Sequence, residues 1–176
     1  MTSTSSSKSS VSSSSSSIIS STLLTTSAGP TTKTTSTTGV FYAVATNIAY
    51  DSEYLSAVQV GSQQQTMNVV YDTGSSDLWI YTTQCSVCSS KSNLFNPSLS
   101  STYIGSSTSY SITYGDGSST SGHTASDIIS IGGASIRQTI DIATTVSTNM
   151  LSDSLDGILG LGFQALESVR GNFLSS

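Results

Sequence analysis

The sequence predicts an all-β fold for the residues that follow about Gly39. β-branched residues dominate this region, and they favour strands over helices. Its short apolar segments end at clusters of Gly, Ser or Asp, which mark turns. Only one segment, close to the end of the chain, has the spacing of an amphipathic helix. We therefore expect several strands, two hairpins and one short helix.

Three strands are expected around an acidic turn, two before it and one after it. Residues 54–60 alternate partly between polar and apolar side chains and end at a Gly-Ser turn signal. Residues 66–72 form the second expected strand, and residues 78–81 form the third. The apolar run before Asp72 places this carboxylate at the end of a strand, where it can face a cleft.

Two hairpins are expected next. Residues 110–114 stop at Gly-Asp-Gly, residues 115–117, which predicts a hairpin tip. Residues 128–131 and 134–142 flank a Gly-Gly pair and predict a second hairpin. One face of its last arm carries three isoleucines interleaved with polar residues: Ile136, Ile140 and Ile142.

The expected helix covers residues 164–174. Leu166, Val169 and Phe173 follow one another at offsets of three and four, which places them on one helical face. Gly171 interrupts this pattern, so the helix is expected to be short.

Residues 1–38 are expected to lie outside the folded domain, as a disordered Ser/Thr-rich tail or linker. Ser and Thr make up 27 of these 38 residues, with two isolated apolar pairs among them. Ordering the backbone costs about 1–2 kcal/mol per residue, which so little apolar burial does not offset. The tail is either an O-glycosylated stalk or an unmodified spacer. Residues 39–176 are the expected domain.

The charge pattern argues against nucleic-acid binding. All ten acidic residues lie in residues 39–176, with only Lys91, Arg137 and Arg170 as cations, so this part carries −7. The two lysines of residues 1–38 bring the chain to −5. A basic patch for phosphates is missing. Because few carboxylates have to be protonated as the pH falls, acid costs little folding stability by that route.

Membrane insertion is not expected either. No apolar stretch approaches the roughly 20 residues that span a bilayer. No cationic start followed by an apolar run opens the chain, so no signal peptide is visible.

The octapeptide D-T-G-S-S-D-L-W, residues 72–79, is the strongest signal for function. Gly74 is expected to take a backbone conformation that a side chain would forbid, which keeps the turn tight. Ser75 is positioned to donate a hydrogen bond to the carboxylate of Asp72 and so to stabilise its charged form. The Thr73 hydroxyl can tie this loop to a matching loop. A lone D-T-G triplet is usually a surface turn, whereas the full octapeptide after an apolar strand is specific.

Four segments in order resemble the pepsin-like aspartic proteases. Residues 72–79 resemble the active-site motif of that family, and residues 95–103 resemble its F-x-P-S-x-S-S-T-Y segment. Residues 112–118 resemble the flap that closes over bound peptide, and residues 156–163 resemble the apolar strand behind the catalytic loop. The resemblance implies an all-β fold that corresponds to a single N-terminal lobe of such a protease, with nothing of the C-terminal lobe.

The resemblance assigns roles in catalysis and in the flap. Asp72 would be the first catalytic aspartate, hydrogen-bonded by Ser75. Tyr114 would be the flap tyrosine, and Trp79 would pack under the flap and share a hydrogen bond with it. Without the motif, Trp79 and Tyr114 would be ordinary core or half-buried strand residues.

Two further flap residues, Gly115 and Asp116, would contact the substrate backbone according to the resemblance. Asp116 has an equally good interpretation as a hairpin-turn residue.

The implied reaction is hydrolysis of a polypeptide substrate without a covalent intermediate. Two neighbouring carboxylates cannot both ionise easily and share one proton, and aspartic proteases are the established example of this arrangement. The ionised member activates a water, and the protonated member polarises the peptide carbonyl; the two titrate as a pair. No cofactor and no metal are expected.

Asp72 supplies only one of the two carboxylates. A second D-T-G or D-S-G triplet does not occur in the 176 residues. The chain is therefore expected to be a fragment of an aspartic endopeptidase that needs a second lobe. Two alternatives are a homodimeric protease and a non-catalytic peptide-binding or surface protein. The resemblance implies a secreted or vacuolar protein.

Cys85 and Cys88 form a small disulfide loop according to the resemblance, which suits an oxidising compartment. A zinc half-site is the competing interpretation, but His123 is the only histidine, so four ligands are not available. A redox C-x-x-C lacks the surrounding βαβ pattern. His123 itself is expected on a strand, facing solvent.

Overall fold

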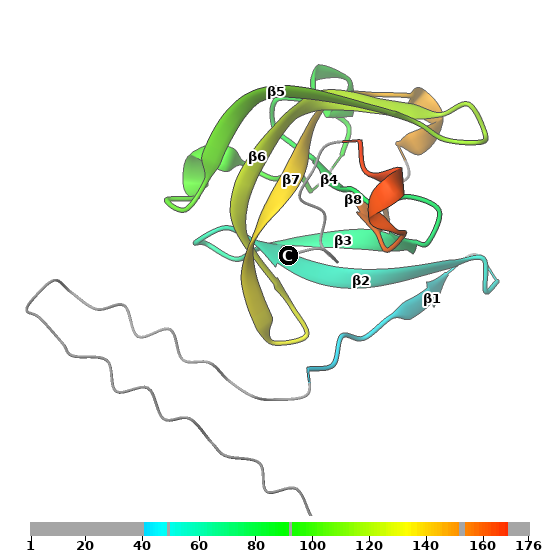
Figure 1. Cartoon of the computed structure of the whole chain (residues 1–176), viewed down its shortest axis with the longest axis horizontal. Helices are drawn as coiled ribbons and strands as arrows, with labels where there is room; N and C mark the ends of the chain where they lie inside the picture. Colours follow the sequence, from blue (N-terminus) through cyan, green and yellow to red (C-terminus); the bar gives the residue numbers. More distant parts are fainter. Residues whose placement is uncertain (1–40, 49, 92, 152–153, 169–176) are drawn as a thin grey trace, which may run out of the picture. The chain divides into compact units, whose positions relative to one another are not determined.

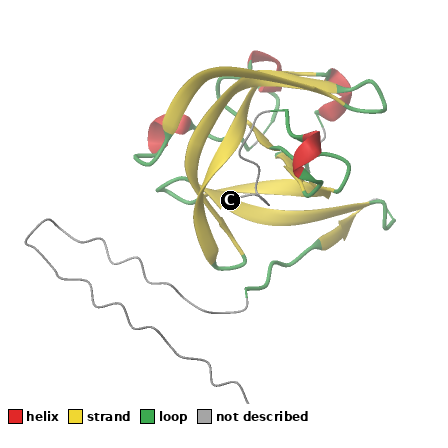
Figure 2. Ribbon diagram, in the orientation of Figure 1, coloured by secondary structure: helices red, strands yellow, loops and turns green. Residues whose placement is uncertain are grey.

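The computed structural model describes residues 41–48, 50–91, 93–151 and 154–168. These residues form a mostly β structure with only short 3-10 turns (Figure 2), so the predicted all-β fold is confirmed. The strands are β1 (Thr46–Ile48), β2 (Glu53–Val60), β3 (Gln65–Asp72), β4 (Leu78–Tyr81), β5 (Ile104–Thr113), β6 (Ser119–Ile131), β7 (Ala134–Val146) and β8 (Gly157–Gly160). The expected tail, residues 1–38, lies outside the described residues.

The strands form one sheet that closes on itself. Its order is β1-β2-β3-β8-β4-β7-β6-β5, and β2 also pairs with β6. This extra pairing joins Gln59 to Ser130 and Val60 to Ile129, so the six strands from β2 to β6 make a closed ring (Figure 1). Closure brings β8, which comes last in the chain, between β3 and β4.

Strand β4 divides the buried side chains into two clusters. Its side chains alternate between the two faces, and all four are buried. Leu78 and Ile80 belong to the first cluster, inside the ring; Trp79 and Tyr81 belong to the second, on the other face. The second cluster also contains the disulfide and Tyr110 of β5.

Both predicted hairpins are present, and both are longer than the sequence indicated. The pair of residues next to the first turn is Thr113 of β5 and Ser119 of β6. The pair next to the second turn is Ile131 of β6 and Ala134 of β7. The second turn depends on glycine, because Gly132 and Gly133 have φ angles of +58° and +93°.

The prediction for β7 needs a correction at both faces. Ile140 and Ile142 are fully buried, as expected, but Ile136 is 38% exposed because it lies near the hairpin turn, away from the core. Asp141, placed by the pattern on a polar face, is only 2% exposed. That face of β7 is covered because β4 and the β5–β6 hairpin pack on the second cluster.

The expected helix at residues 164–174 is only the 3-10 turn η4 (Gln164–Leu166) in its described part. Glu167 leaves the helical region, with φ −66° and ψ 133°. The backbone N–H of Ser168 donates to the carboxylate of Asp77 instead of continuing a helical ladder. The rest of the expected helix, residues 169–174, lies outside the described residues.

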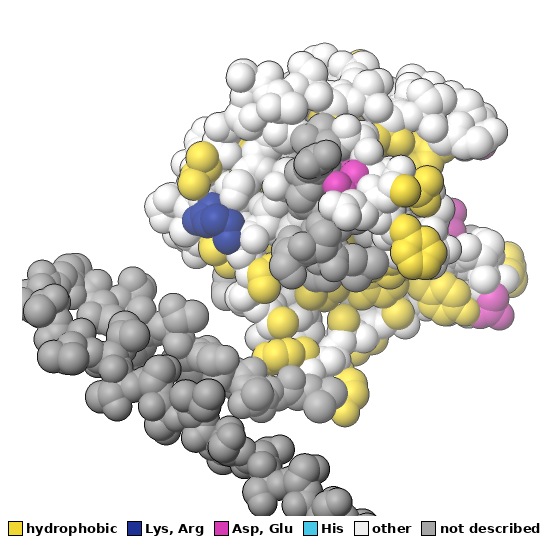
Figure 3. Space-filling view, in the orientation of Figure 1, with side chains coloured by type: hydrophobic (Ala, Val, Ile, Leu, Met, Phe, Trp, Pro, Cys, Tyr) yellow, Lys and Arg dark blue, Asp and Glu magenta, His cyan; other side chains and the backbone are white. Residues whose placement is uncertain are grey.

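The surface carries little charge. On the face shown in Figure 3, acidic and basic side chains are sparse and uncharged polar groups dominate between apolar patches, in line with the composition. His123 lies on β6, as expected, but is half-buried and only partly solvent-facing. Among the described residues, no helix is long and apolar enough to cross a membrane.

Candidate active site

Asp72 is the last residue of β3, and its carboxylate is held by donors from its own turn. The backbone N–H of Gly74 donates to Oδ1 at 2.8 Å, and the Ser75 hydroxyl donates to Oδ2 at 2.6 Å. Ser75 is 8% exposed, whereas Asp72 itself is half-buried. The carboxylate is therefore fixed in direction yet remains accessible from one side.

The end of β8 supports this turn from behind. Strand β8 pairs in parallel with β3, with Gly160 opposite Asp72. The backbone N–H of Leu161 donates to the Asp72 carbonyl, and that of Gly162 donates to the Ser75 carbonyl, both at 2.7 Å. The segment that resembled the supporting strand therefore occupies that position.

The tightness of the turn has a different cause from the one expected at Gly74. Gly74 is not among the residues with positive φ, so no left-handed conformation is needed there. A Cβ at this position would instead lie 3.2 Å from the Asp72 Oδ1 atom. Gly160 is more constrained still, since a Cβ would lie 2.6 Å from the Asp77 nitrogen and from Ser76.

The β5–β6 hairpin places Tyr114 beside this turn. The Trp79 indole N–H donates to the Tyr114 hydroxyl at 2.7 Å, and Trp79 is fully buried. Burial, partly offset by this hydrogen bond, raises the pKa of Tyr114 to about 12, and the charge of Asp72 adds to the increase. The Tyr114 hydroxyl therefore stays protonated at acidic and neutral pH, and it can donate a hydrogen bond into the hollows that it lines.

Asp116 forms the turn at the tip of the hairpin. Its carboxylate accepts from the Ser118 hydroxyl at 2.6 Å and from the Ser118 backbone N–H at 2.9 Å, which lowers the pKa of Asp116. Gly117 has a φ angle of +82°, which favours glycine. These contacts support the interpretation of Asp116 as a turn residue, and contact with substrate remains a prediction for Asp116 and Gly115.

Two hollows meet at the hairpin tip, and Asp72 lines one of them. The first, of about 370 Å³, is lined by Gly74, Ser75, Asp77, residues 111–115 and residues 165–168. The second, of about 520 Å³, is lined by Asp72 and by Asp116, Met150, Leu155 and Ile158 among others. Tyr114 and Gly115 line both. Together they make a groove that passes the carboxylate and has the hairpin over it.

Cys85 and Cys88 form the predicted disulfide. Both are nearly or fully buried in the second cluster, around the 3-10 turn η1 (Ser86–Cys88). Because their sulfurs are bonded to each other, neither is a ligand for zinc.

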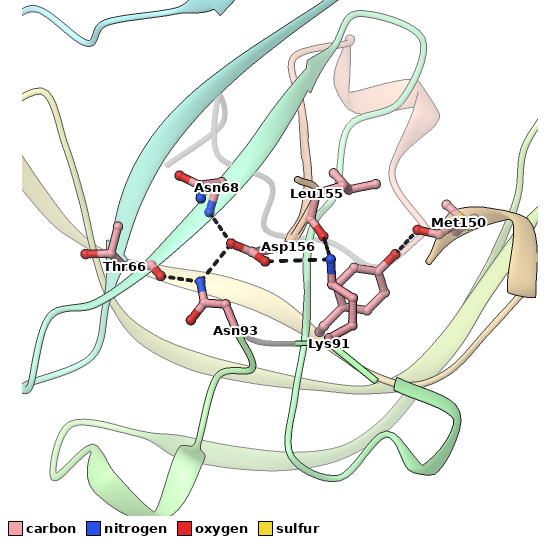
Figure 4. A network of polar contacts seen from close by, with 8 residues as sticks. Thr66, Asn68, Lys91, Asn93, Met150, Leu155 and Asp156 are labelled. Atoms are coloured by element: carbon pink, nitrogen blue, oxygen red, sulfur yellow. Dashed lines mark hydrogen bonds and ion pairs between the residues drawn. The ribbon is translucent and has the colours of Figure 1, made fainter. Parts of the chain in front are cut away.

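A buried polar network that the sequence analysis missed anchors the start of β8 (Figure 4). Asp156 Oδ2 accepts from the Asn68 backbone N–H at 2.8 Å and from the Asn93 side-chain amide at 2.7 Å. Lys91 lies 3.9 Å from Asp156 Oδ1, and its ammonium donates to the Leu155 carbonyl at 2.5 Å. The signal in the sequence was an acidic residue directly before an apolar strand.

Lys91 also connects the network to the disulfide loop. Its backbone N–H donates to the Cys88 carbonyl, and its ammonium lies 5.2 Å from the centre of the Tyr81 ring. The ion pair is almost fully buried, so removing one partner would leave an uncompensated charge. The network therefore ties β3, the disulfide loop and β8 together behind the turn of Asp72.

The profile of one protein family, described as "Eukaryotic aspartyl protease", matches residues 53–175. The chain belongs to this family. Its relatives include syncephapepsin of Syncephalastrum racemosum, 49% identical over 127 residues, and rhizopuspepsin-3 of Rhizopus niveus, 43% identical over 137 residues. Endothiapepsin of Cryphonectria parasitica is 40% identical over 123 residues.

These matches cover unequal parts of the two chains. They include 72%, 77% and 68% of this chain but only 32%, 35% and 29% of syncephapepsin, rhizopuspepsin-3 and endothiapepsin. The chain thus spans about a third of the length of these aspartyl proteases. The family places this chain among the aspartic endopeptidases, and the activity of the chain itself is a separate question.

Proposed function

We propose that this chain supplies one half of the active site of an aspartic endopeptidase, with Asp72 as its catalytic carboxylate. The observation that carries the proposal is the position of Asp72 at the floor of a groove. Ser75 orients the carboxylate, and Tyr114, held by Trp79, lies over it. Gly115 and Asp116 at the hairpin tip would contact the peptide backbone.

The chemistry requires a second carboxylate, from another lobe or a second copy. One carboxylate of the pair would take a proton from water while the other, protonated, polarises the peptide carbonyl. Phe163 and Leu166, which follow the supporting strand, are 86% and 52% exposed. Such exposed apolar side chains beside the turn of Asp72 suit a contact with a second lobe.

A peptide-binding protein without activity is the second candidate. The single D-T-G triplet favours it, because one carboxylate lacks the partner that holds the shared proton. A homodimer that pairs two copies of Asp72 is the third candidate. The three differ in whether the chain cleaves, binds or dimerises.

We further infer that residues 1–38 form a tail outside the domain of residues 39–176 and that the protein is secreted or vacuolar. The Ser/Thr-rich composition supports the tail. The Cys85–Cys88 disulfide supports an oxidising compartment.

The first test incubates the purified chain with an unfolded protein at acidic pH and looks for cleavage. The mass of the purified chain in solution is measured separately. We expect a monomer that does not cleave. Cleavage that pepstatin inhibits and that Asp72→Asn abolishes, together with a dimer mass, would favour the homodimer instead. Pepstatin or peptide binding without turnover in every assay would favour the non-catalytic candidate.

The second test supplies a second lobe. The chain is refolded with the part of syncephapepsin that it does not cover, which the resemblance predicts to carry the second aspartate loop. Peptide cleavage should appear and should fall at least about 100-fold with Asp72→Asn, the usual minimum for loss of a general acid–base group. Asp51→Asn, which removes an exposed carboxylate far from the turn in sequence, is the matched control.

A further inference from the structure

Residues 165–168 form one wall of the first hollow. The loop that follows Asp72 holds this wall in place. The Ser76 hydroxyl donates to the Phe163 carbonyl at 2.8 Å, and the backbone N–H of Gly160 donates to the Asp77 carbonyl at 2.9 Å. These bonds fix the chain just before residues 164–168. Beyond η4, the wall is fastened by a contact with the Asp77 side chain.

The carboxylate of Asp77 accepts from the backbone N–H of Ser168 through both oxygens, at 2.9 and 3.2 Å. Asp77 is 6% exposed, and it lines the first hollow together with residues 165–168. A hydrogen bond to a charged acceptor is about twice as strong as one between neutral groups. The position of the wall therefore depends on the charge of Asp77.

A second buried carboxyl group interacts electrostatically with Asp77. Asp141 of β7 is 2% exposed and stands opposite Trp79 in the β4–β7 pairing, two residues along from Asp77. One of its oxygens, Oδ2, has no hydrogen-bond partner among the described residues. A charged oxygen buried in this way is very costly, so the neutral form is favoured. Burial, followed by the charge of Asp77, raises the pKa of Asp141 to about 8.

The other titratable groups that interact with this pair in the described part of the chain do not offset its charge. Tyr110 of β5 interacts with both carboxyl groups, and Tyr114 interacts with Asp77. Burial raises the pKa of each tyrosine, so both stay neutral. The partners of Asp141 on β4 and β6, Trp79 and Thr124, do not ionise.

We propose that Asp77 is a positioning residue of the cleft, whose carboxylate holds the wall of residues 165–168 while the neutral carboxyl of Asp141 leaves that charge unopposed. When Asp141 ionises, its charge repels that of Asp77, and the contact with Ser168 weakens. The wall is then ordered at acidic and neutral pH and loosens as the pH rises through the ionisation of Asp141. That the wall contacts substrate rests on the function proposed above.

The experiment uses the whole chain, labelled for NMR, without peptide. It follows hydrogen exchange at the Ser168 amide and the carboxyl signal of Asp141 from acidic to alkaline pH. In the wild type, protection of Ser168 beyond the intrinsic pH dependence of exchange should fall as Asp141 ionises near pH 8. In Asp141→Asn that protection should persist over the same range.

Two variants at Asp77 separate positioning from mere packing. Asp77→Ala should speed exchange at Ser168 by about tenfold or more, as expected for a lost charged hydrogen bond. Asp77→Asn keeps an acceptor of the same shape and should restore part of the protection. Both should lower the pH at which Asp141 ionises, because the neighbouring charge is gone. Asp51→Asn should change neither signal.

Unchanged exchange at Ser168 in Asp77→Ala, or an Asp141 that ionises near pH 4 in the wild type, would overturn the proposal. If the alanine variant does not fold, Asp77→Asn tests the same point through the ionisation of Asp141. Pepstatin provides a separate arm, measured on the chain refolded with the second lobe: equal affinity of the wild-type and Asp77→Asn complexes contradicts positioning. No pepstatin binding to the wild-type complex with the second lobe, with the expected NMR results, would refute the proposed function and leave the wall contact standing.

Discussion

The carboxylate of Asp72 takes its two hydrogen bonds from residues two and three positions further along the chain. Such local contacts follow from the turn itself, so the motif alone was sufficient to predict the bond from Ser75. The Trp79–Tyr114 bond joins residues 35 positions apart and was expected only from the family resemblance. Asp77 belongs to the same octapeptide, yet nothing in the motif indicated its contact with Ser168, 91 positions away.

Replacing Tyr114 by Phe should destabilise the domain. The indole N–H of Trp79 would lose its acceptor inside the protein, which costs about 1–3 kcal/mol of unfolding free energy. Urea unfolding measures the loss. Tyr50→Phe is the control, because Tyr50 is fully exposed and its replacement should stay within about 0.5 kcal/mol. Equal effects of the two substitutions would show that the Trp79–Tyr114 bond contributes nothing to stability.

The element that decides the geometry of the site is β8. It is only four residues long, yet it lies between β3 and β4 and bonds to the turn that joins them. Its start is held by Asp156 and Lys91, and its end depends on glycines that approach the turn after Asp72 closely. A strand with larger residues at these positions would push the turn away from β3.

Gly160→Ala tests this close approach. The added Cβ would lie 2.6 Å from backbone atoms of Ser76 and Asp77, so the turn has to move, at a cost of about 1–3 kcal/mol typical of overpacking. Urea unfolding should report the loss of stability, and NMR should show displaced amide signals at Ser75. Gly115→Ala is the control for stability, since a Cβ there meets nothing within 4 Å. A wild-type spectrum and stability for Gly160→Ala would contradict the role given to β8.

At the scale of the whole molecule, closure of the sheet buries more carboxyl groups than the composition indicated. Asp77, Asp127, Asp141 and Asp156 are each at most 6% exposed. The low number of acidic residues was expected to make stability insensitive to acid. The burial of Asp141 adds a sensitivity in the opposite direction, toward alkaline pH.

The unfolding free energy should therefore fall as the pH rises from about 4 to about 8. Between the ordinary pKa of an aspartate, about 3.9, and its raised value, about 8, Asp141 binds a proton in the folded state but not in the unfolded state. The contribution of Asp141 to the unfolding free energy is complete below its ordinary pKa and is lost as the pH rises through its raised pKa. The slope is at most about 1.4 kcal/mol per pH unit.

Urea unfolding of wild type and Asp141→Asn at pH 4, 6 and 8 isolates this contribution, because all other groups are shared. The variant should show a flatter dependence. Parallel curves for the two proteins would mean that Asp141 ionises normally in the folded state.

Much of the fold was readable because its signals are local. The strand before Asp72, β4 and the two hairpins follow from short apolar segments and from glycines at their turns. The disulfide came from the resemblance and is present. The β5–β6 hairpin is present as well, and its role as a flap stays a prediction. The helix at residues 164–174 was overestimated because the spacing of three apolar residues does not show that Ser168 has a competing partner in Asp77.

The order of residues along the chain was sufficient to predict the β class, the family and the placement of Asp72 at the end of a strand, since each of these depends on short local segments of the sequence. The ring closure through β2 and β6, the insertion of β8 and the burial of Asp141 depend on contacts between segments separated by dozens of residues. Solvent exposure depends on how the elements pack. The alternation of polar and apolar residues in a strand is the same whether its polar face contacts water or a second packed layer, so the sequence pattern did not show that Asp141 is buried.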